Sequence, residues 1–343
     1  MKFKRDVSLA KHSTMRLGGP AAYLVEVTKR EQVAEAVSFA DDNNLPVVMI
    51  GNGSNIIWSD GGFRGVVIVC KIKYYDEFKE NDFNSYITVG SGENWDSVVA
   101  RTTKSGLSGI EAMSLIPGTV GATPIQNVGA YGQEIADTLV SVEAYDRQSK
   151  SFVSIPKIDC RFGYRTSRFK NEDKHRFFIT GITMHLTRST MVRPFYQALE
   201  DYVKTNNILE YSPETIRNAV MTIRRSKMPD PAVVANSGSF FSNPIVSAAE
   251  FKALQTKFPG VIAWDVGEGK YKLAAGWLIE QAGYRGVYDP ETGMATWGNQ
   301  AMVLVNQKAK STRDLLIFKQ KIIDEVSKKM GVNLVPEPEY IGG

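Results

Sequence analysis

The sequence predicts an α+β protein of two or three domains. Its 343 residues exceed the roughly 100–200 residues of a typical domain. A strand–helix–strand pattern near the N-terminus leads into a strand-rich region, and helical patterns dominate after Thr190. Apolar residues make up 43% and charged residues 23% of the chain. These shares are typical of a soluble globular protein and exclude disordered, collagen-like, coiled-coil and disulfide-stapled chains.

The first predicted elements form a β-α-β unit. Residues 21–27 are rich in aromatic and β-branched residues and predict a strand. Apolar residues at helical spacing predict a helix over 29–44. The short apolar run at 45–51 is typical of a buried strand, and it leads into the loop Gly51–Asn55.

The middle of the chain is strand-rich and contains one long loop. Residues 95–106 predict a helix, and strands are predicted over 65–70, 85–90, 138–146, 151–155 and 176–186. Between these elements, residues 106–134 are rich in Gly and contain two Pro. Loops of this length are uncommon and usually functional. We therefore expect one α+β body, in two subdomains, over about 15–188.

The last third of the chain is predicted to be mostly helical. Ser212 is a natural N-cap, with Pro213 at the first helical position. An apolar stripe on the last helix indicates core packing. Residues 301–306 predict a strand, and the predicted helices cover 195–207, 212–228, 248–258, 272–283 and 311–330.

Charge, cysteines and hydropathy favour a cytoplasmic enzyme. The net charge of +4 is too small to indicate nucleic acid binding by itself. Cys70 and Cys160 have no CxxC spacing and indicate reduced thiols. The basic N-terminus lacks the apolar stretch of a signal peptide, and no apolar run reaches the ~18–20 residues of a membrane span. We expect no membrane association and no obligate protein partner.

Several common catalytic motifs do not match this sequence. Neither GNGSNI nor GSGENW has the third glycine of the dinucleotide fingerprint, and no P-loop or G-x-S-x-G elbow occurs. The three histidines do not form a zinc-binding pattern, so no metal site is predicted. The sequence therefore disfavours a dinucleotide-fingerprint domain, a P-loop NTPase, an α/β hydrolase and a zinc enzyme.

Two Gly-rich loops indicate a phosphorylated ligand. Gly51–Asn55 has the composition of a phosphate-binding backbone nest, although this motif alone favours a simple tight turn. The second loop, residues 114–134, interleaves glycines with Thr, Gln and Asn. Such a segment suits a backbone that runs along a ligand and donates many hydrogen bonds. Two such loops in one body favour a large phosphorylated cofactor.

Three further segments have two interpretations each. Residues 160–170 alternate Arg and Lys with aromatic residues, as in a solvated basic face or an anion clamp. Ser239, between a Gly and two Phe, fits a simple turn or a hydroxyl exposed beside an apolar wall. Glu337 and Glu339 stand among prolines in a tail that usually is only surface.

The ordered set of these motifs resembles the UDP-N-acetylenolpyruvoylglucosamine reductase family over roughly residues 12–342. The motifs are GNGSN, SLIPGTVGATPIQNVGAYGQE, GYRTSRFK, KMPDP with GSFFSNP, KLAAGWLIEQAG, NQAMVLVN and PEPEYIGG. The resemblance implies a two-subdomain FAD-binding body of the vanillyl-alcohol-oxidase type and a C-terminal α+β substrate-binding domain. The implied boundaries are 1–65, with 331–343 returning to it, then 66–195 and 196–330.

The resemblance also implies the cofactors. FAD would be held non-covalently, since the Gly-rich loops contain no His or Cys for attachment. NADPH would reduce the flavin and leave, and the sugar nucleotide would then enter the same channel. The implied FAD contacts are Ile50, Gly51, Asn52, Gly53, Ser54, Asn55, Pro117, Gly118, Gly121, Ala122, Gln126, Asn127, Gly129, Ala130 and Tyr131.

Catalytic and substrate-binding residues are implied in the same way. Ser239 matches the proton donor, and Arg165 and Glu337 match groups that stabilise charge on the substrate carboxylate. Val335 and Pro338 depart from the family pattern around Glu337, so Glu339 stays the alternative. The implied substrate contacts are Tyr196, Lys227, Asn243, Trp264 and Gln300, with Trp264 standing where long-form members often have Tyr.

The resulting hypothesis is an NADPH-dependent, FAD-containing reductase. It would convert UDP-N-acetylglucosamine enolpyruvate to UDP-N-acetylmuramate for peptidoglycan, and hence for cell-wall biogenesis, cell shape and division. A different FAD-dependent oxidase or dehydrogenase on the same scaffold is the first alternative. A non-catalytic FAD- or UDP-sugar-binding module is the second, and a nucleic acid interface at 161–170 and 224–227 is the least favoured.

Overall fold

The computed structural model describes residues 1–342, which form two compact units. Unit 1 comprises residues 1–7, 21–53 and 64–225, and unit 2 comprises residues 8–20, 54–63 and the chain from 226 onward. The segment 196–225 thus lies in unit 1. The three-part division implied above stays a prediction.

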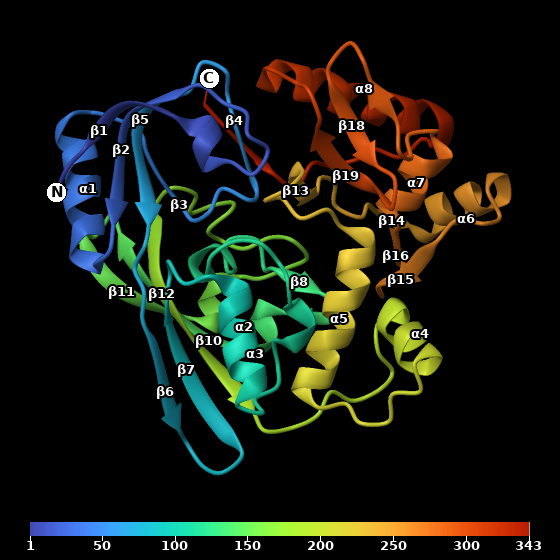
Figure 1. Ribbon diagram of the computed structural model, residues 1–343, viewed down its shortest axis with the longest axis horizontal. Coiled ribbons are helices and arrows are strands. Elements are labelled where there is room, and N and C mark those ends of the chain that lie inside the picture. Colours follow the sequence, from blue (N-terminus) through green and yellow to red (C-terminus); the bar gives the residue numbers. More distant parts are fainter. Residues whose placement is uncertain (343) are drawn as a thin grey trace. The chain divides into compact units, whose positions relative to one another are not determined.

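The first layer of unit 1 contains the predicted β-α-β unit. Its strands are β1 (Lys4–Ser8), β2 (Pro20–Val27), β3 (Val47–Ile50) and β5 (Phe63–Cys70), in the order β1-β2-β5-β3 (Figure 1). Strands β3 and β5 run parallel, with Val47 opposite Val66. Helix α1 (Arg30–Asp42) buries Val33, Ala36, Val37 and Ala40 in the core beside this sheet, which confirms the predicted helical face.

The second layer of unit 1 is a five-stranded antiparallel sheet in the order β11-β10-β12-β7-β6. Helix α2 (Trp95–Lys104) packs on its core, which includes Ile87, Val98 and Ile182. Strand β6 was not predicted, because its residues are mostly exposed and charged. The strands are β6 (Tyr75–Lys79), β7 (Asn84–Gly90), β10 (Leu139–Asp146), β11 (Ser151–Pro156) and β12 (Phe177–Thr187).

The long Gly-rich segment at 106–134 is mostly irregular, as predicted. It contains short 3₁₀ turns at Glu111–Met113 and Val120–Ala122. It ends in a small hairpin of β8 (Gly129–Ala130) and β9 (Gln133–Glu134), followed by α3 (Ile135–Thr138). Many of its residues are nevertheless buried, so this loop is part of the body of unit 1.

Two helices complete unit 1. Helix α4 spans Gln197–Thr205 and α5 spans Pro213–Lys227, the last two residues of α5 falling in unit 2. Ser212 caps α5 as predicted, since its Oγ accepts the Thr215 N–H at 3.2 Å. Apolar residues of both helices form one buried cluster with Ala112 and Tyr131 of the Gly-rich segment.

Unit 2 contains three small sheets, three whole α-helices and a 3₁₀ helix at Leu9–His12 among its described residues. The sheets have the orders β13-β19-β18-β17, β14-β16-β15 and β20-β4. The strands are β4 (Ile56–Trp58), β13 (Ala235–Ser239), β14 (Ile245–Ser247), β15 (Ala263–Asp265), β16 (Lys270–Leu273), β17 (Tyr288–Asp289), β18 (Met294–Trp297), β19 (Gln300–Asn306) and β20 (Glu339–Ile341). The helices are α6 (Ala248–Lys257), α7 (Ala275–Gln281) and α8 (Thr312–Met330).

One predicted helix of unit 2 is corrected by the structure. The helix expected over 272–283 begins at Ala275, because Lys270–Leu273 is strand β16. This strand pairs with β14 on one side and β15 on the other. The backbone hydrogen bonds to two neighbours outweigh the modest helical preference of these four residues.

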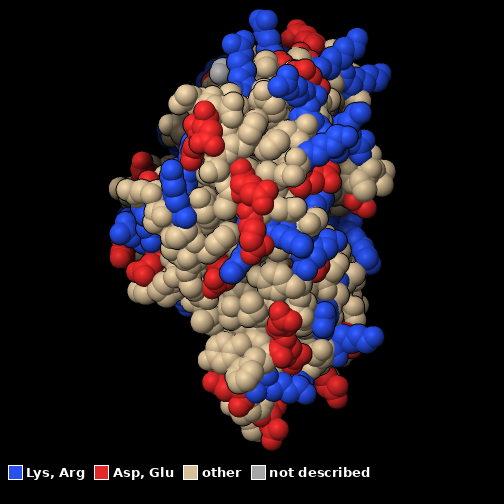
Figure 2. Space-filling view, turned by 90° about the vertical axis from the view of Figure 1, so that its left-hand side faces the viewer, with Lys and Arg blue, Asp and Glu red and all other residues tan. Residues whose placement is uncertain are grey.

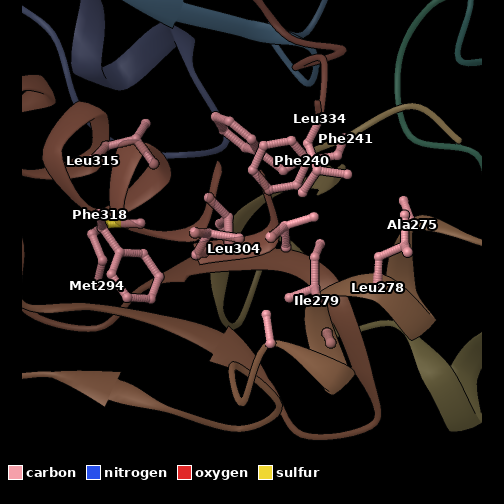
Figure 3. Close-up of a cluster of buried hydrophobic side chains, with 14 of the residues drawn as sticks. Phe240, Phe241, Ala275, Leu278, Ile279, Met294, Leu304, Leu315, Phe318 and Leu334 are labelled. Carbon is pink, nitrogen blue, oxygen red and sulfur yellow. The ribbon is translucent and has the colours of Figure 1, made fainter. Parts of the chain in front are cut away.

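The core of unit 2 joins segments far apart in the sequence (Figure 3). Phe240 and Phe241, from the chain just after β13, lie near Leu334. Leu315 and Phe318 come from α8, whose apolar stripe is buried as predicted. This packing fixes the chain around residues 239 and 335, which matters for the site.

The surface is mixed in charge. Figure 2 shows Lys and Arg interspersed with Asp and Glu over one face, in line with the small net charge. Within residues 1–342, no helix combines the length and the apolar composition that crossing a membrane requires.

Candidate active site

The two Gly-rich loops touch each other within unit 1. Gly51 follows directly on β3, and a Cβ added there would lie 2.1 Å from the Oγ1 of Thr119. Only glycine allows this close approach. Gly53, with a φ of +66°, lets the first loop turn back. The sequence indicated a shared ligand for the two loops, and the contact between Gly51 and Thr119 brings them to one place.

The second loop runs beside residues 91–94, the segment between β7 and α2. The N–H of Gly121 donates to the carbonyl of Ser91 at 3.0 Å, and the N–H of Val120 donates to that of Glu93 at 3.0 Å. A Cβ on Gly121 would lie 1.7 Å from the Ser91 Oγ, which itself donates to the carbonyl of Ile179 at 2.6 Å. Gly121 is therefore required by packing, whether or not a ligand binds there.

The residues of these loops fit the diphosphate of FAD. Gly51 and Gly121 sit where a Cβ would collide with a neighbour, so the backbone is free of side chains at these points. No carboxylate occurs within residues 50–55 or 117–132, and Asn, Ser and Thr supply short polar groups. Backbone nests of this composition bind anions.

Asn127, a predicted FAD contact, has its side chain committed to the protein. It is 1% exposed and has a φ of +48°, which Asn tolerates better than most residues. Its Nδ2 donates to the Glu134 Oε2 at 2.6 Å and to the Gly163 carbonyl at 3.2 Å, and its Oδ1 accepts the Ala136 N–H at 3.1 Å. The Asn127 side chain therefore holds the loop in shape.

The basic stretch at 160–170 is fastened to the same loop. Gly163 and Thr166 exchange backbone hydrogen bonds of 3.1 and 3.2 Å, which places Tyr164 and Arg165 at the tip of a tight turn. The Oγ of Ser167 donates to the Ile125 carbonyl at 2.6 Å. These hydrogen bonds hold the stretch against residues 125–129, and its role as an anion clamp stays a prediction.

Arg165 itself is held in an unusual backbone conformation. Its φ is +53°, in the left-handed region that non-glycine residues rarely adopt. Its Nη2 donates to the carbonyl of Gly129 at 2.8 Å. Strain of this kind concentrates at functional sites. The guanidinium thus lies beside the end of the Gly-rich loop.

In unit 2, Glu337 lies next to Phe240, the residue that follows Ser239. The N–H of Glu337 donates to the carbonyl of Phe240 at 2.9 Å. The Nδ2 of Asn55 donates to the carbonyl of Glu337 at 3.4 Å, and Asn55 accepts the N–H of Glu339 at 3.0 Å. Glu337 pairs with the Ser239 segment and Glu339 with β4, so the backbone favours Glu337 as the partner of Ser239.

The predicted substrate contacts fall in several places. In unit 1, Tyr196 precedes α4 and meets the Tyr131 ring edge-on at 5.7 Å. In unit 2, the Oδ1 of Asn243 accepts the Ala275 N–H at 2.9 Å, and the Oε1 of Gln300 lies against Gly276, the next residue of α7. Asn243 and Gln300 are therefore close to one end of one helix.

The remaining two predicted contacts, Lys227 and Trp264, lie on other elements of unit 2. Lys227 is exposed at the end of α5. Trp264 is on β15, with the Lys272 Nζ 5.9 Å from its ring centre. An ammonium group at this distance from an indole is attracted by the ring face.

Sequence reasoning missed residues that support the site. Asn236 is 2% exposed, and its Oδ1 accepts the N–H of Gly238 at 2.8 Å, which shapes the turn before Ser239. Arg217 points from the apolar face of α5 into the body of unit 1. A charged residue inside an apolar helical stripe was the available signal for Arg217, whereas nothing in the local sequence marks Asn236.

Comparison with known proteins decides the family. Residues 21–152 match the FAD binding domain family, and residues 230–341 match the C-terminal domain family of UDP-N-acetylenolpyruvoylglucosamine reductase. The UDP-N-acetylenolpyruvoylglucosamine reductase of Ralstonia nicotianae is 39% identical over 336 residues, with 97% of each chain covered. That of Thermobifida fusca is 38% identical over 353 residues, covering 99% of this chain and 98% of the other. The chain belongs to the UDP-N-acetylenolpyruvoylglucosamine reductase family.

The solved structures agree with this fold. The crystal structure of the reductase from Thermus caldophilus superposes with a TM-score of 0.68 at 23% identity, covering both chains completely. The predicted fold class, an FAD-binding body with a C-terminal α+β domain, is confirmed. As a UDP-N-acetylenolpyruvoylglucosamine reductase family member, the protein is an FAD-containing oxidoreductase of peptidoglycan synthesis.

Proposed function

We propose that the enzyme reduces UDP-N-acetylglucosamine enolpyruvate to UDP-N-acetylmuramate with NADPH, in the cytoplasm. The observation that carries the proposal is the contact between the Gly-rich loops at Gly51 and Thr119, with Arg165 fastened beside the second loop. This arrangement combines a diphosphate-binding backbone with a cation suited to a carboxylate. The named relatives, 38–39% identical over nearly their whole length, support the same reaction.

The fifteen loop residues named above from Ile50 to Tyr131 would hold the FAD. Backbone N–H groups of the two loops bind the diphosphate, and Asn127 and Gln126 keep the second loop in shape. When bound, FAD supplies a hydride, taken from NADPH, to the methylene carbon of the enolpyruvyl group.

The substrate carboxylate is the part of the reaction that the protein must stabilise. Negative charge grows on it as the double bond is reduced, and Arg165 neutralises this charge through a charge-assisted hydrogen bond. Glu337, in its protonated form, donates a second hydrogen bond to the same group. Ser239 then gives a proton to the adjacent carbon.

The sugar nucleotide would be bound by the remaining predicted contacts. Lys227 and Asn243 suit the diphosphate, since an ammonium and an amide both donate to phosphate oxygens. Trp264 and Tyr196 offer aromatic surfaces to the nucleotide end, and Gln300 offers an amide. These assignments rest on the family resemblance.

Stopped-flow absorbance tests the proposal in two half-reactions. NADPH should bleach the yellow enzyme without air, and the enolpyruvyl sugar nucleotide should restore the colour. We expect Ser239→Ala to bleach at the normal rate but to recover colour about 10²–10⁴-fold more slowly, because a proton donor is lost. Ser242→Ala, three residues away, is the matched control and should behave like the unaltered enzyme.

The opposite outcomes point to the alternative function. If NADPH does not bleach the flavin, but the enzyme turns over with an alcohol and oxygen, the protein is an oxidase on this scaffold. Normal colour recovery in both Ser239→Ala and Arg165→Ala would exclude the assigned roles while leaving the reductase activity itself in place.

A further inference from the structure

A buried ion pair connects α5 to the start of the second Gly-rich loop. The guanidinium of Arg217 donates from Nη1 to the Asp96 Oδ1 at 2.6 Å and from Nη2 to Oδ2 at 3.0 Å. It also donates to the Ser114 Oγ at 2.9 Å. The Arg217 side chain is 11% exposed and that of Asp96 25% exposed. Because the cost of desolvating such a pair offsets much of its attraction, its presence is weak evidence for added stability.

Asp96 shares its carboxylate between this ion pair and the loop backbone. It lies in the first turn of α2, and its Oδ1 also accepts the N–H of Leu115 at 2.7 Å. Burial would raise the pKa of Asp96. The hydrogen bonds from Arg217 and from the Leu115 N–H, with the charges of Arg217 and Arg224, outweigh burial and hold that pKa below its ordinary value. The carboxylate stays ionised and bound at neutral pH.

Leu115 is the residue that this arrangement constrains. Its φ is +56°, a left-handed conformation that is strained for a leucine. Its N–H is taken by Asp96, and its carbonyl accepts the Nη2 of Arg224 at 3.3 Å. Arg224 is two helical turns after Arg217, so both arginines reach the loop from one face of α5. The side chains of Asp96 and Arg224 therefore hydrogen-bond to the backbone N–H and carbonyl of Leu115.

The turn at Leu115 sets the direction in which the loop continues. Pro117 and Gly118 follow at once, and the carbonyl of Gly118 accepts the Trp95 N–H at 3.2 Å. Residues 118–121 then run beside residues 91–95, the segment that leads into α2. Asp96, the next residue, thus fixes the entry to the stretch whose backbone meets the FAD diphosphate in the proposed function.

We propose that Asp96 and Arg217 are positioning residues for the flavin, which lock Leu115 in its left-handed conformation and so set the path of residues 117–121. The proposal rests on the placement of the FAD diphosphate at this loop. Neither residue touches the reacting atoms. By holding the Leu115 backbone, they raise the affinity for FAD and set the surroundings of the flavin.

The test uses variants that separate positioning from stability. In the Asp96→Ala, Arg217→Met double variant, the ion pair and the acceptor of the Leu115 N–H are removed together. Arg224 keeps its charge without Asp96 beside it, so the thermal midpoint should fall, but by less than in Asp96→Ala alone, which leaves two arginines without that carboxylate. We expect the FAD dissociation constant, followed by flavin fluorescence, to rise about 10–100-fold, as for other residues that orient a binding group. The flavin absorbance bands should shift as well.

A third substitution provides the rescue. Glycine adopts a φ of +56° without strain. Adding Leu115→Gly to the double variant should therefore recover at least half of the lost FAD affinity on a logarithmic scale. Arg147→Met, which breaks the Arg147–Asp41 ion pair elsewhere in unit 1, is the matched control and should leave FAD affinity unchanged.

Two results would overturn the proposal. One is unaltered FAD affinity and absorbance in the double variant, and the other is lost affinity that Leu115→Gly does not recover. The placement of FAD is checked separately with Gly121→Ala. If Gly121→Ala leaves FAD affinity unchanged, the placement itself fails. If Gly121→Ala weakens FAD binding and the double variant does not, the positioning proposal alone fails.

Discussion

Two segments carry much of the proposed site, and different interactions hold them in place. Residues 114–132 of unit 1 depend on buried polar and charged side chains, such as Asn127 and Arg217, and on glycines packed against neighbours. Residues 335–341 of unit 2 depend on backbone hydrogen bonds to β4 and to the chain after β13. The first segment should therefore be sensitive to single side-chain changes, and the second should tolerate them.

The largest effect that tests this difference is expected for Gly121→Ala. The new Cβ would lie 1.7 Å from the Ser91 Oγ and 2.8 Å from its Cβ, and the buried Ser91 cannot move aside. We expect the free energy of unfolding to fall by about 3 kcal/mol and FAD retention to be largely lost. Urea denaturation and flavin fluorescence measure the two effects.

Gly260→Ala is the control for this prediction, because a Cβ there meets nothing within 4 Å. It should change the stability by less than about 0.5 kcal/mol. If both variants behaved alike, close packing would not be what shapes the second Gly-rich loop.

A smaller effect is expected for Asp146→Asn, at the end of the β10 strand in the sheet that supports the loop. Hydrogen bonds from Arg176, with smaller contributions from Gln148 and Ser149, lower the pKa of Asp146 to about 2 against the effect of burial. A carboxyl group with a lowered pKa stabilises the fold above its unfolded pKa of about 4. This contribution is lost as the pH falls towards 2.

At pH 7 we therefore expect Asp146→Asn to lower the free energy of unfolding by about 2 kcal/mol. Denaturation curves between pH 7 and pH 2.5 should show the two proteins converging at the acid end. Asp76→Asn, on the exposed part of β6, is the matched control and should have little effect at any pH. A difference that stayed constant with pH would argue against the ion pair as its cause.

The smallest effect is expected in the C-terminal segment. Val335 is 60% exposed, and its carbonyl accepts the Ser242 N–H at 2.9 Å. Val335→Ala keeps this hydrogen bond, so the thermal midpoint should barely change and FAD should stay bound. Glu339→Pro, which removes the N–H that Asn55 accepts, should lower the midpoint clearly. A large effect of Val335→Ala would mean that side chains hold this segment too.

Much of the fold could be predicted because its signals are local. The face of α1 and the stripe of α8 follow from apolar residues at helical spacing, and both are buried. The short strands of unit 2 were missed or misassigned, as at Lys270–Leu273, because strands of two to five residues form only when distant partners pair with them.

Some residues of the candidate site could be predicted from local motifs, and others could not. Gly51, Gly121 and Arg165 stand in recognisable motifs, so their residue types already pointed to an anionic ligand. Asp96 and Arg217 are 121 positions apart, and their contact exists only after the chain has folded. Side chains that act by holding another residue's backbone leave little trace in the local sequence.

The pairing of β20 with β4 has a consequence for the order of synthesis on the ribosome. Glu339–Ile341 lies beside Ile56–Trp58 in the folded protein, although Trp58 and Glu339 are 281 positions apart in the sequence. At roughly 5–20 residues per second, about 15–60 s pass between the two segments leaving the peptidyl transferase centre. During this time residues 56–58 lack the strand that they pair with in the folded protein, and their unpaired backbone groups can pair with other chains. Nascent chains stalled between residues 225 and 335 should therefore be the species most dependent on chaperones.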